Sequence, residues 1–525
     1  MAISTSTGYK TAIKADTELT RLESEFGFYP TGSIENAVVS SNDASSVSRL
    51  SQLKDGVKQT KKFASAELNR WILNGTFEFI DTDDSSMQVG DWSEIISGTD
   101  RTFSDPKPAY TYTLNTSYDI VGVTLFFDSA GNEWATNITI AYYNSSETLI
   151  ESETFTNDST VMAVEMPATG VKKIVATINE WCLPGRHVKC CEILPGETFL
   201  FTPDNTFSFE FHEIIQPFET SLETPYFTIE FDNSEKKFDI VNPSGLVSYL
   251  RQKMQMLSKI GLDVDSVFEY ISTGNFYLYE WPDEAQNDTA KFTCRPEMAF
   301  KSSVYYVAPD TGTQTVATAA SVIFTTAGIT SYTVDSTLQD ITVNQYIGEN
   351  VPLLNAMGQL AIAAGGYWKF NRDGSYSLLP IEILADSTDT IDYDNMWEKP
   401  DITQEKKYTS VNVKYYTVDT ESESFNENNS KVTATTDDGE TASDITSCFI
   451  PSAARAIAIG NLALEYYAMR LSYSVDYRGD MSMEAGDVLS IENDYGTSDM
   501  LVLEHDIKWD TGDKLTASFT GIGGT

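Results

Sequence analysis

Residues 361–380, AIAAGGYWKFNRDGSYSLLP, run from small apolar residues through two glycines into an aromatic stretch, a charged turn and a second apolar stretch. The glycine pair predicts the end of a helix, because glycine adopts the left-handed backbone conformation that closes many helices. The dipeptide Asp373-Gly374 then predicts a tight hairpin turn between two strands. Upstream, after the start signals Asn350 and Pro352, one apolar stripe of a helix is formed by Leu353, Leu354, Met357, Leu360, Ala361 and Ala364.

The charge of the chain limits its function. Its 525 residues include 35 basic and 77 acidic side chains, which gives a net charge of -42. Such a charge repels phosphate, so we expect neither sequence-specific nucleic-acid binding nor binding to an anionic membrane. No stretch approaches the ~20 apolar residues that span a bilayer, and the N-terminal sequence lacks the apolar block of a signal peptide. We therefore expect no membrane span and no export by that route.

The uneven distribution of charge predicts a boundary near residue 70. Residues 1–69 carry eight basic and eight acidic side chains, so the rest of the chain holds the whole net charge. A helix is predicted over Tyr9–Leu22, and the serine-rich stretch 41–50 is typical of a loop or an ordered arm. We assign residues 1–70 to an N-terminal helix and a connecting arm.

Short alternating strands are predicted over residues 71–205, and turn clusters separate them at 128–133 and 143–147. Several strands at this spacing predict an antiparallel β-sandwich. The alternate apolar positions are Val123, Leu125 and Phe127, then Ile138, Ile140 and Tyr142, then Ile174, Ala176 and Ile178.

A second β-rich region begins at residue 206, where Phe227, Ile229 and Phe231 alternate with polar residues. The stretch 243–262 is compatible with one helix or with a short helix followed by a strand, and we favour the second. A threonine- and alanine-rich stretch at 311–332 precedes the helix and hairpin described above. A second helix is predicted from about Ser452 to Arg470, and the chain ends in predicted strands at VLSI, DMLVLEHDIKW and KLTASF.

The sequence shows no recognisable metal site. His187, His212 and His505 lie far apart and form no HExxH or HxH pair. The acidic turn at 81–84, DTDD, lacks the spacing of a calcium loop. The five cysteines are too few and too scattered for a disulfide framework, so we expect reduced thiols at Cys182, Cys190, Cys191, Cys294 and Cys448. Adjacent side chains on a strand point to opposite faces, so Cys190 and Cys191 are not expected to share a metal.

The sequence also lacks the motifs of the common enzyme classes. It has no GxSxG elbow, no phosphate-binding glycine loop and no dinucleotide-binding fingerprint. We predict no catalytic residue, no metal and no cofactor, and hence a protein that is not an enzyme. The remaining candidates for a binding site are aromatic residues of the predicted sandwich, because exposed aromatic rings can stack on the apolar faces of sugars. The candidates for carbohydrate contact are Trp92, Trp134 and Tyr142, and the alternative for each is a place in the core.

Three stretches in order resemble the tail-tip or baseplate hub proteins of bacteriophages. FEFHEIIQPFETSLETPYFTIEFDNSEKKFDIVNPSGLVSYL resembles the first hub barrel, and LLNAMGQLAIAAGGYWKFNRDGSYSLLPI resembles the helix and hairpin of that family. The helix AARAIAIGNLALEYYAM followed by YSVDYRGDMSMEAGDVLSI resembles the last hub barrel. The segment ELNRWILNGTFEFI with the sandwich after it is similar to a discoidin-like or carbohydrate-module-like insertion in tail proteins of phages and prophages of Gram-positive bacteria.

This resemblance implies a mainly β chain with a minor α/β part, built from hub-type β-barrel domains and an inserted antiparallel β-sandwich. The implied domains are the arm at 1–70, the sandwich at 71–205, a first barrel at 206–305, a small α/β helix-hairpin lobe at 306–400 and a second barrel with a helix at 401–525.

The implied function is that of a structural hub, made in the host cytoplasm and placed in the virion tail. A homotrimeric ring would continue the tail tube, let DNA pass and bind distal tail, tape-measure, tip or receptor-binding proteins. Host cell-wall glycans are a further expected partner. The alternatives are a carbohydrate-binding host-surface adhesin and a cell-wall hydrolase with an unrecognised site.

Overall fold

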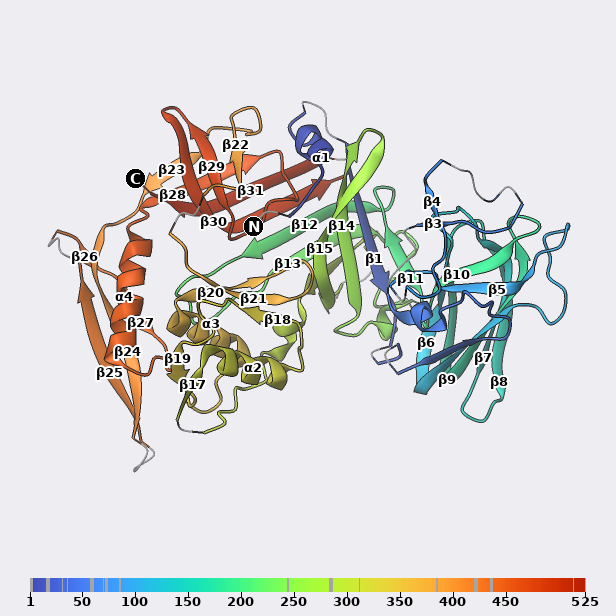
Figure 1. Cartoon of the computed structure of the whole chain (residues 1–525), viewed down its shortest axis with the longest axis horizontal. Coiled ribbons are helices and arrows are strands. Elements are labelled where there is room, and N and C mark those ends of the chain that lie inside the picture. Colours follow the sequence, from blue (N-terminus) through green and yellow to red (C-terminus); the bar gives the residue numbers. More distant parts are fainter. Residues whose placement is uncertain are drawn as a thin grey trace. The chain divides into compact units, whose positions relative to one another are not determined.

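The computed structural model describes residues 3–15, 19–30, 32–34, 36–56, 61–68, 70, 74–84, 86–242, 245–282, 287–310, 312–383, 386–419, 424–434, 438–512 and 514–524. The predicted start of the sandwich at Trp71 lies outside these residues, as does part of the segment ELNRWILNGTFEFI. The fold is mainly β with a few helices, as predicted (Figure 1).

The chain divides into two compact units. The minor unit holds Glu25–Leu200 and Pro243–Gln255, and the major unit holds the residues up to Ser24, Phe201–Asn242 and the chain from Met256 onward. The chain passes between the units within β1 (Thr20–Gly27) and near the end of β11 (Thr198–Phe201). The part of the predicted 1–70 arm from Glu25 onward therefore belongs to the same compact unit as the strands predicted to form a sandwich.

The minor unit contains one antiparallel sheet in the order β5-β10-β6-β9-β7-β8, with β2 paired to β6. Its strands are β2 (Val38–Ser41), β5 (Asp91–Ile96), β6 (Ala109–Phe127), β7 (Ala135–Tyr143), β8 (Leu149–Thr156), β9 (Val161–Trp181) and β10 (His187–Leu194). The same unit holds the short elements η1 (Leu50–Lys54), β3 (Lys62–Phe63), β4 (Phe77–Glu78) and η2 (Val247–Tyr249).

The predicted alternation of the minor unit is confirmed, because the three apolar sets at 123–127, 138–142 and 174–178 all lie in one buried core. Adjacent residues of β10 point to opposite faces, as expected for a strand. Cys190 contributes to this core, whereas Cys191 packs in a separate cluster with Phe126 and Leu194.

The major unit is built on a sheet in the order β1-β14-β15-β16-β13-β12-β30-β31-β28-β23. Strand β12 pairs with β30 from Ser208↔Asp510 to Ile214↔Glu504, so the two predicted barrel regions share one continuous sheet (Figure 1). Strand β22 extends it in parallel with β29, which pairs with β30. The strands are β12 (Thr206–Ile214), β13 (Tyr226–Asp232), β14 (Gln255–Val264), β15 (Val267–Glu280), β16 (Thr289–Arg295), β22 (Asp389–Ile391), β23 (Asp401–Gln404), β28 (Leu471–Tyr477), β29 (Val488–Asn493), β30 (Gly496–Asp510) and β31 (Lys514–Gly523).

Two predictions near the ends of this sheet have different outcomes. The choice of a short helix followed by a strand within 243–262 is confirmed by η2 and β14. The predicted helix over Tyr9–Leu22 is wrong beyond its first turns, since α1 covers Thr7–Ala12 and Leu22 lies in β1. In β1, Thr20, Leu22 and Ser24 are buried alternately with more exposed neighbours, a period of two that suits a strand and not a helix.

The helix-hairpin lobe has the predicted elements and one that was not predicted. Helix α3 (Leu353–Ala364) ends at Gly365, whose φ of 67° is the left-handed conformation expected for the glycine pair. The unpredicted element is helix α2 (Val316–Ala327), within the stretch at 311–332. The Thr315 side chain caps its start by accepting a hydrogen bond from the Thr318 N–H, and the helix ends at Gly328. Short elements complete the lobe: η3 (Glu297–Lys301), β17 (Thr313–Thr315), β18 (Tyr332–Val334), β19 (Thr342–Asn344), β20 (Gly366–Phe370) and β21 (Tyr376–Pro380).

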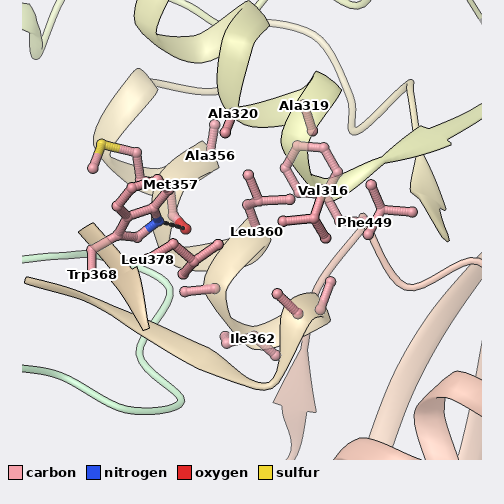
Figure 2. Packing of buried hydrophobic residues seen from close by; sticks show 14 of the residues in the cluster. Val316, Ala319, Ala320, Ala356, Met357, Leu360, Ile362, Trp368, Leu378 and Phe449 are labelled. Carbon is pink, nitrogen blue, oxygen red and sulfur yellow. Dashed lines mark hydrogen bonds between the residues drawn. The ribbon is translucent and has the colours of Figure 1, made fainter. Parts of the chain in front are cut away.

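Figure 2 shows how the lobe is held together. Ala356 and Leu360 of α3 lie beside Ala320 and Val316 of α2. Met357 lies on the side of Trp368, whose indole Nε1 donates to the Met357 carbonyl at 3.0 Å. The same core includes Phe449 and the inner residues of helix α4 (Ala453–Tyr467), the second predicted helix, which begins at Ser452 as expected. Helix α4 packs on β24 (Tyr408–Asp419) and β25 (Ser424–Thr433), which pair with each other; β26 (Glu440–Thr441) and β27 (Ile445–Thr446) pair with β24.

Gly358 lets α3 approach another backbone closely. A Cβ at this position would lie 2.5 Å from the Thr220 carbonyl oxygen and 2.7 Å from that of Glu219. Backbone atoms cannot move away as a flexible side chain can, so the helix requires a glycine here.

We expect Gly358→Ala to destabilise the major unit by about 1–3 kcal/mol, although alanine is the better helix former. Urea unfolding of the full chain measures this loss. The matched control is Asn355→Ala in the same helix, where the higher helix propensity should leave stability unchanged or slightly raised. Equal behaviour of the two variants would show that the close approach is not limiting.

The hairpin between β20 and β21 turns so that Arg372 points into the protein. The Asn371 N–H donates to the Ser375 carbonyl and the Gly374 N–H to the Asn371 carbonyl, both at 2.9 Å, and Gly374 has a φ of 84°. The loop is thus one residue longer than the tight two-residue turn predicted from Asp373-Gly374, because Arg372 also lies within it. This extra residue carries a buried charge.

Arg372 joins the lobe to the large sheet. Its Nε and Nη2 donate to the two carboxylate oxygens of Glu213 on β12, at 2.8 and 2.6 Å, and it also donates to the carbonyls of Met481 and Met483. Burial disfavours the Glu213 carboxylate, but the charge and hydrogen bonds of Arg372 outweigh it and lower the pKa of Glu213 to about 2. Behind this pair, Tyr477 and the buried His505 form a hydrogen bond of 2.9 Å through the Tyr477 hydroxyl and Nε2.

Removing one partner of the pair leaves the other charge buried and uncompensated. We expect Arg372→Met to cost about 3–5 kcal/mol in urea unfolding, and Arg372→Met combined with Glu213→Met to cost less than the single change. The exposed pair of Lys399 with Asp494 provides the control, because Lys399→Met should leave stability unchanged. A double variant less stable than Arg372→Met would contradict the pairing as the cause.

Candidate functional surface: the polar face of the large sheet

One face of the large sheet is lined with polar side chains. Along β30, Glu504, Asp506, Lys508 and Asp510 alternate with buried His505, Ile507 and Trp509. Pairing between strands keeps side chains of paired residues on the same face. We call this surface the polar face, and its residues are Tyr226, Glu230, Ser208, Glu210, His212, Glu504, Asp506, Lys508, Asp510, Thr516, Ser518, Thr520, Ser474 and Asp476.

The opposite face of these strands is a core of large apolar side chains. Phe209 of β12 packs at a tilt against Phe227, and Phe211 packs edge-on against Phe276. Phe519 of β31 lies over Tyr477 with ring centroids 4.6 Å apart. The period of two therefore fixes which side chains reach solvent. A shift of one residue in any strand would bury its polar residues.

A row of paired residues crosses the polar face from Asp476 through Ser518, Asp506 and His212 to Tyr226. His212 Nδ1 lies 2.8 Å from Asp506 Oδ1, and the imidazole stacks on the Tyr226 ring with centroids 5.0 Å apart. Partial burial acts against the charged imidazole, but the hydrogen bond and charge of Asp506 raise the pKa of His212 above its usual value. Burial disfavours the charged form of Asp506, but its hydrogen bond with His212 and the charge of His212 outweigh this and lower the pKa of Asp506.

The other contacts on this face are an exposed ion pair and a partly buried hydrogen bond. Lys508 Nζ lies 3.5 Å from Glu210 Oε1, and the Thr520 hydroxyl donates to Glu504 at 3.1 Å. Carboxylates outnumber cations in the named set, so the face carries a negative field. Such a surface repels phosphate groups and provides no anchor for an anionic polymer.

The structure separates the three residues predicted to contact carbohydrate. Trp92 is 3% exposed, and Tyr142 is fully buried within the core of the minor unit. Neither ring presents a face to solvent, so stacking on a sugar is left to Trp134 alone, which is half-buried. Trp92 instead lies against the charges of Arg70 and Lys189, at 5.6 and 5.0 Å from the ring centroid.

The described residues contain no group of three or more histidine, cysteine, aspartate or glutamate side chains placed to hold a metal ion. The exposed turn at 81–84 is ordered by its own side chains, with Asp81 Oδ1 accepting from the Asp83 N–H and Asp84 Oδ1 from the Ser86 N–H, each at 2.9 Å. In the part of the chain that the structure covers, no helix is long and apolar enough to cross a membrane.

No protein-family model matches the chain, and no curated protein matches it. Solved structures give a different result. The chain is similar in structure to phage tail proteins.

Three of these structures are the tail protein from Neisseria meningitidis, the 43 kDa tail protein of prophage MuSo2 from Shewanella oneidensis and the prophage tail protein gp18 from Listeria monocytogenes. The first is 10% identical, over 62% of this chain and 93% of its own length, with a TM-score of 0.43. The second is 11% identical, over 62% and 96%, with a TM-score of 0.43. The third is 12% identical, over 61% and 91%, with a TM-score of 0.39.

Sequence reasoning did not single out the polar face, although part of the signal is visible. In LVLEHDIKWD, residues 501–510, charged residues occur at every second position from Glu504 onward. That pattern identifies the solvent side of one strand. It does not reveal that β12 and β28 bring further carboxylates to the same surface, because these strands come from distant parts of the sequence.

We expect His212 to titrate at a higher pH than His505, because Asp506 stabilises the protonated form of His212 and raises its pKa. Complete burial lowers the pKa of His505. Nitrogen-15 NMR of the imidazoles in the full chain measures both values. Asp506→Asn should lower the His212 midpoint, whereas Asp510→Asn, farther along the same strand, should not. Equal shifts in both variants would show that the general negative field, rather than the hydrogen bond, raises the His212 pKa.

Proposed function

We propose that this protein is a structural hub of a phage tail tip or of a tail-like particle. Three copies form a ring that continues the tail tube, and the polar face of each copy lines the passage. The observation that carries this proposal is the continuous sheet in which β12 pairs with β30, so that one surface spans both barrel regions. The order of hub-like stretches in the sequence supports it further.

The charge of the polar face suits a passage for DNA. Glu210, Glu504 and Asp506 lie on adjacent strands, and an acidic wall keeps phosphates from binding as the polymer moves. A wall of arginine and lysine would instead hold DNA through each phosphate it neutralised. The net charge of -42 extends this repulsion to the chain as a whole.

The sheet also has an edge that a second copy would cover. Strand β23 pairs with β28 on one side and, among the described strands, with none on the other. All four of its residues are exposed, including the apolar Ile402. Open edges favour uncontrolled pairing between chains, and a closed symmetric assembly removes them.

A structural role requires no reactive group, and two of the three histidines have structural partners. His212 is held by Asp506, and His505, which has no exposed surface, is bonded to Tyr477. The adhesin and hydrolase alternatives make different predictions from the hub. Release of sugar or peptide from purified cell wall would identify a hydrolase.

Image reconstruction of the intact particle tests the proposal directly. We expect three copies of the chain in one ring at the tail tip, with Glu210 and Asp506 facing the lumen. One, two or six copies per ring, or absence from the tail, would contradict the hub. Three copies with the polar face turned outward would retain the hub and reject the acidic lining of the passage.

The assembly of the purified chain into trimers should depend on salt concentration. Like charges on the subunits oppose association, and salt at about 0.5 M reduces the range of this repulsion to a few ångströms. Raising the salt concentration should therefore favour trimer over monomer in sedimentation experiments.

A further inference from the structure

A groove with an exposed tryptophan lies at the β28 side of the polar face. It has a volume of about 480 Å³ and is lined by Trp397, Glu398, Asp476, Asp506, Lys508 and Ser518, among others. Trp397 lies on the segment between β22 and β23 and is 61% exposed, although tryptophan is an apolar residue of large area. The groove therefore combines an open indole ring with charged side chains.

The indole is held in place although it is exposed. Its Nε1 donates to the Tyr477 carbonyl at 2.8 Å, and the Trp397 backbone N–H donates to the Asp476 carbonyl at 3.0 Å. A ring fixed in this way loses little conformational freedom when a ligand covers it, which is the property of aromatic anchors in binding sites.

Some charged side chains of the groove already have ion-pair partners and others do not. Asp506 is bonded to His212, and Lys508 pairs with Glu210. Asp476 and Glu398 are both exposed, and neither has an ion-pair partner among the described residues. The groove thus offers an aromatic face and two uncommitted negative charges.

We propose that this groove binds an arginine-bearing segment of a partner protein. A guanidinium group stacks on an indole face and donates to carboxylates at the same time, and tryptophan is the best aromatic acceptor for such a cation. A second copy of this chain has only 35 basic residues against 77 acidic ones, so an arginine-rich partner segment complements the charge of the groove better. A neutral sugar would use the ring but would leave the charges of Asp476 and Glu398 without a partner.

This partner contact goes beyond the hub function and does not require it. The groove, its indole and its carboxylates all belong to one copy of the major unit. The contact can therefore be tested on the isolated full chain, whatever the copy number in the particle.

Fluorine NMR of the full chain labelled with 5-fluorotryptophan tests the proposal. Trp397→Phe identifies the Trp397 resonance, and the remaining tryptophan resonances show that the fold is retained. The probe is the peptide acetyl-Gly-Arg-Gly-amide, with the isosteric neutral peptide containing citrulline as the ligand control. We expect the arginine peptide to shift the Trp397 resonance saturably and the citrulline peptide to shift it at least threefold less at equal concentration.

Variants of the carboxylates complete the test. Asp476→Asn combined with Glu398→Gln should weaken binding of the arginine peptide at least threefold, while Glu153→Gln, on the exposed strand β8 of the minor unit, should leave it unchanged. Equal effects of these variants, or no Trp397 shift, would overturn the proposal. So would a stronger response to chitotetraose, which would indicate a sugar site, or a concentration-dependent shift without peptide, which would indicate a second copy.

Discussion

The buried ion pair of Arg372 with Glu213 is the constraint on which the major unit depends. It fixes the tip of the β20–β21 hairpin on β12, the strand that also pairs with β30, so the lobe and both halves of the large sheet meet at one bidentate contact. A buried pair of this kind contributes little net stability, because desolvation offsets the attraction. The pair instead fixes the orientation of the hairpin on the sheet, because the bidentate contact of a planar guanidinium with a carboxylate forms in few other arrangements.

Buried ion pairs also occur in the minor unit. There Arg70 pairs with Asp128 and Glu133, and Lys189 pairs with Glu67 and Glu133, all with buried side chains. These buried cations are accompanied by buried carboxylates, so the remaining surface keeps the acidic excess of the chain as a whole.

The polar face is acidic because carboxylates outnumber cations among its own residues. On the polar face, His212 and Lys508 are each held by a neighbouring carboxylate, which leaves an acidic surface that repels phosphate. At its margin, Trp397 adds an apolar ring next to Asp476, and the same negative field that repels a polyanion attracts a guanidinium. One electrostatic surface can thus exclude DNA and select a basic protein segment.

The sequence by itself determined the local features of this protein. Gly365 ends α3 and Ser452 begins α4 because their effects act within one helical turn. Alternation also predicts the buried apolar positions Phe227, Ile229 and Phe231 of β13, although Thr228 between them is buried as well. Helix α2 was missed because its β-branched and threonine-rich sequence has weak helix propensity, and packing of Val316, Ile323 and Phe324 on α3 and its surroundings stabilises it instead.

Only the tertiary structure decided what depends on distant residues. No local pattern indicates that β12 pairs with β30, nearly 300 residues later, and the polar face exists because of that pairing. Likewise, the aromatic residues Trp92 and Trp397 look alike in the sequence, yet the first is covered by its surroundings in the minor unit and the second is open. Burial is set by which segments fold over a side chain, and that information lies elsewhere in the chain than the residue itself.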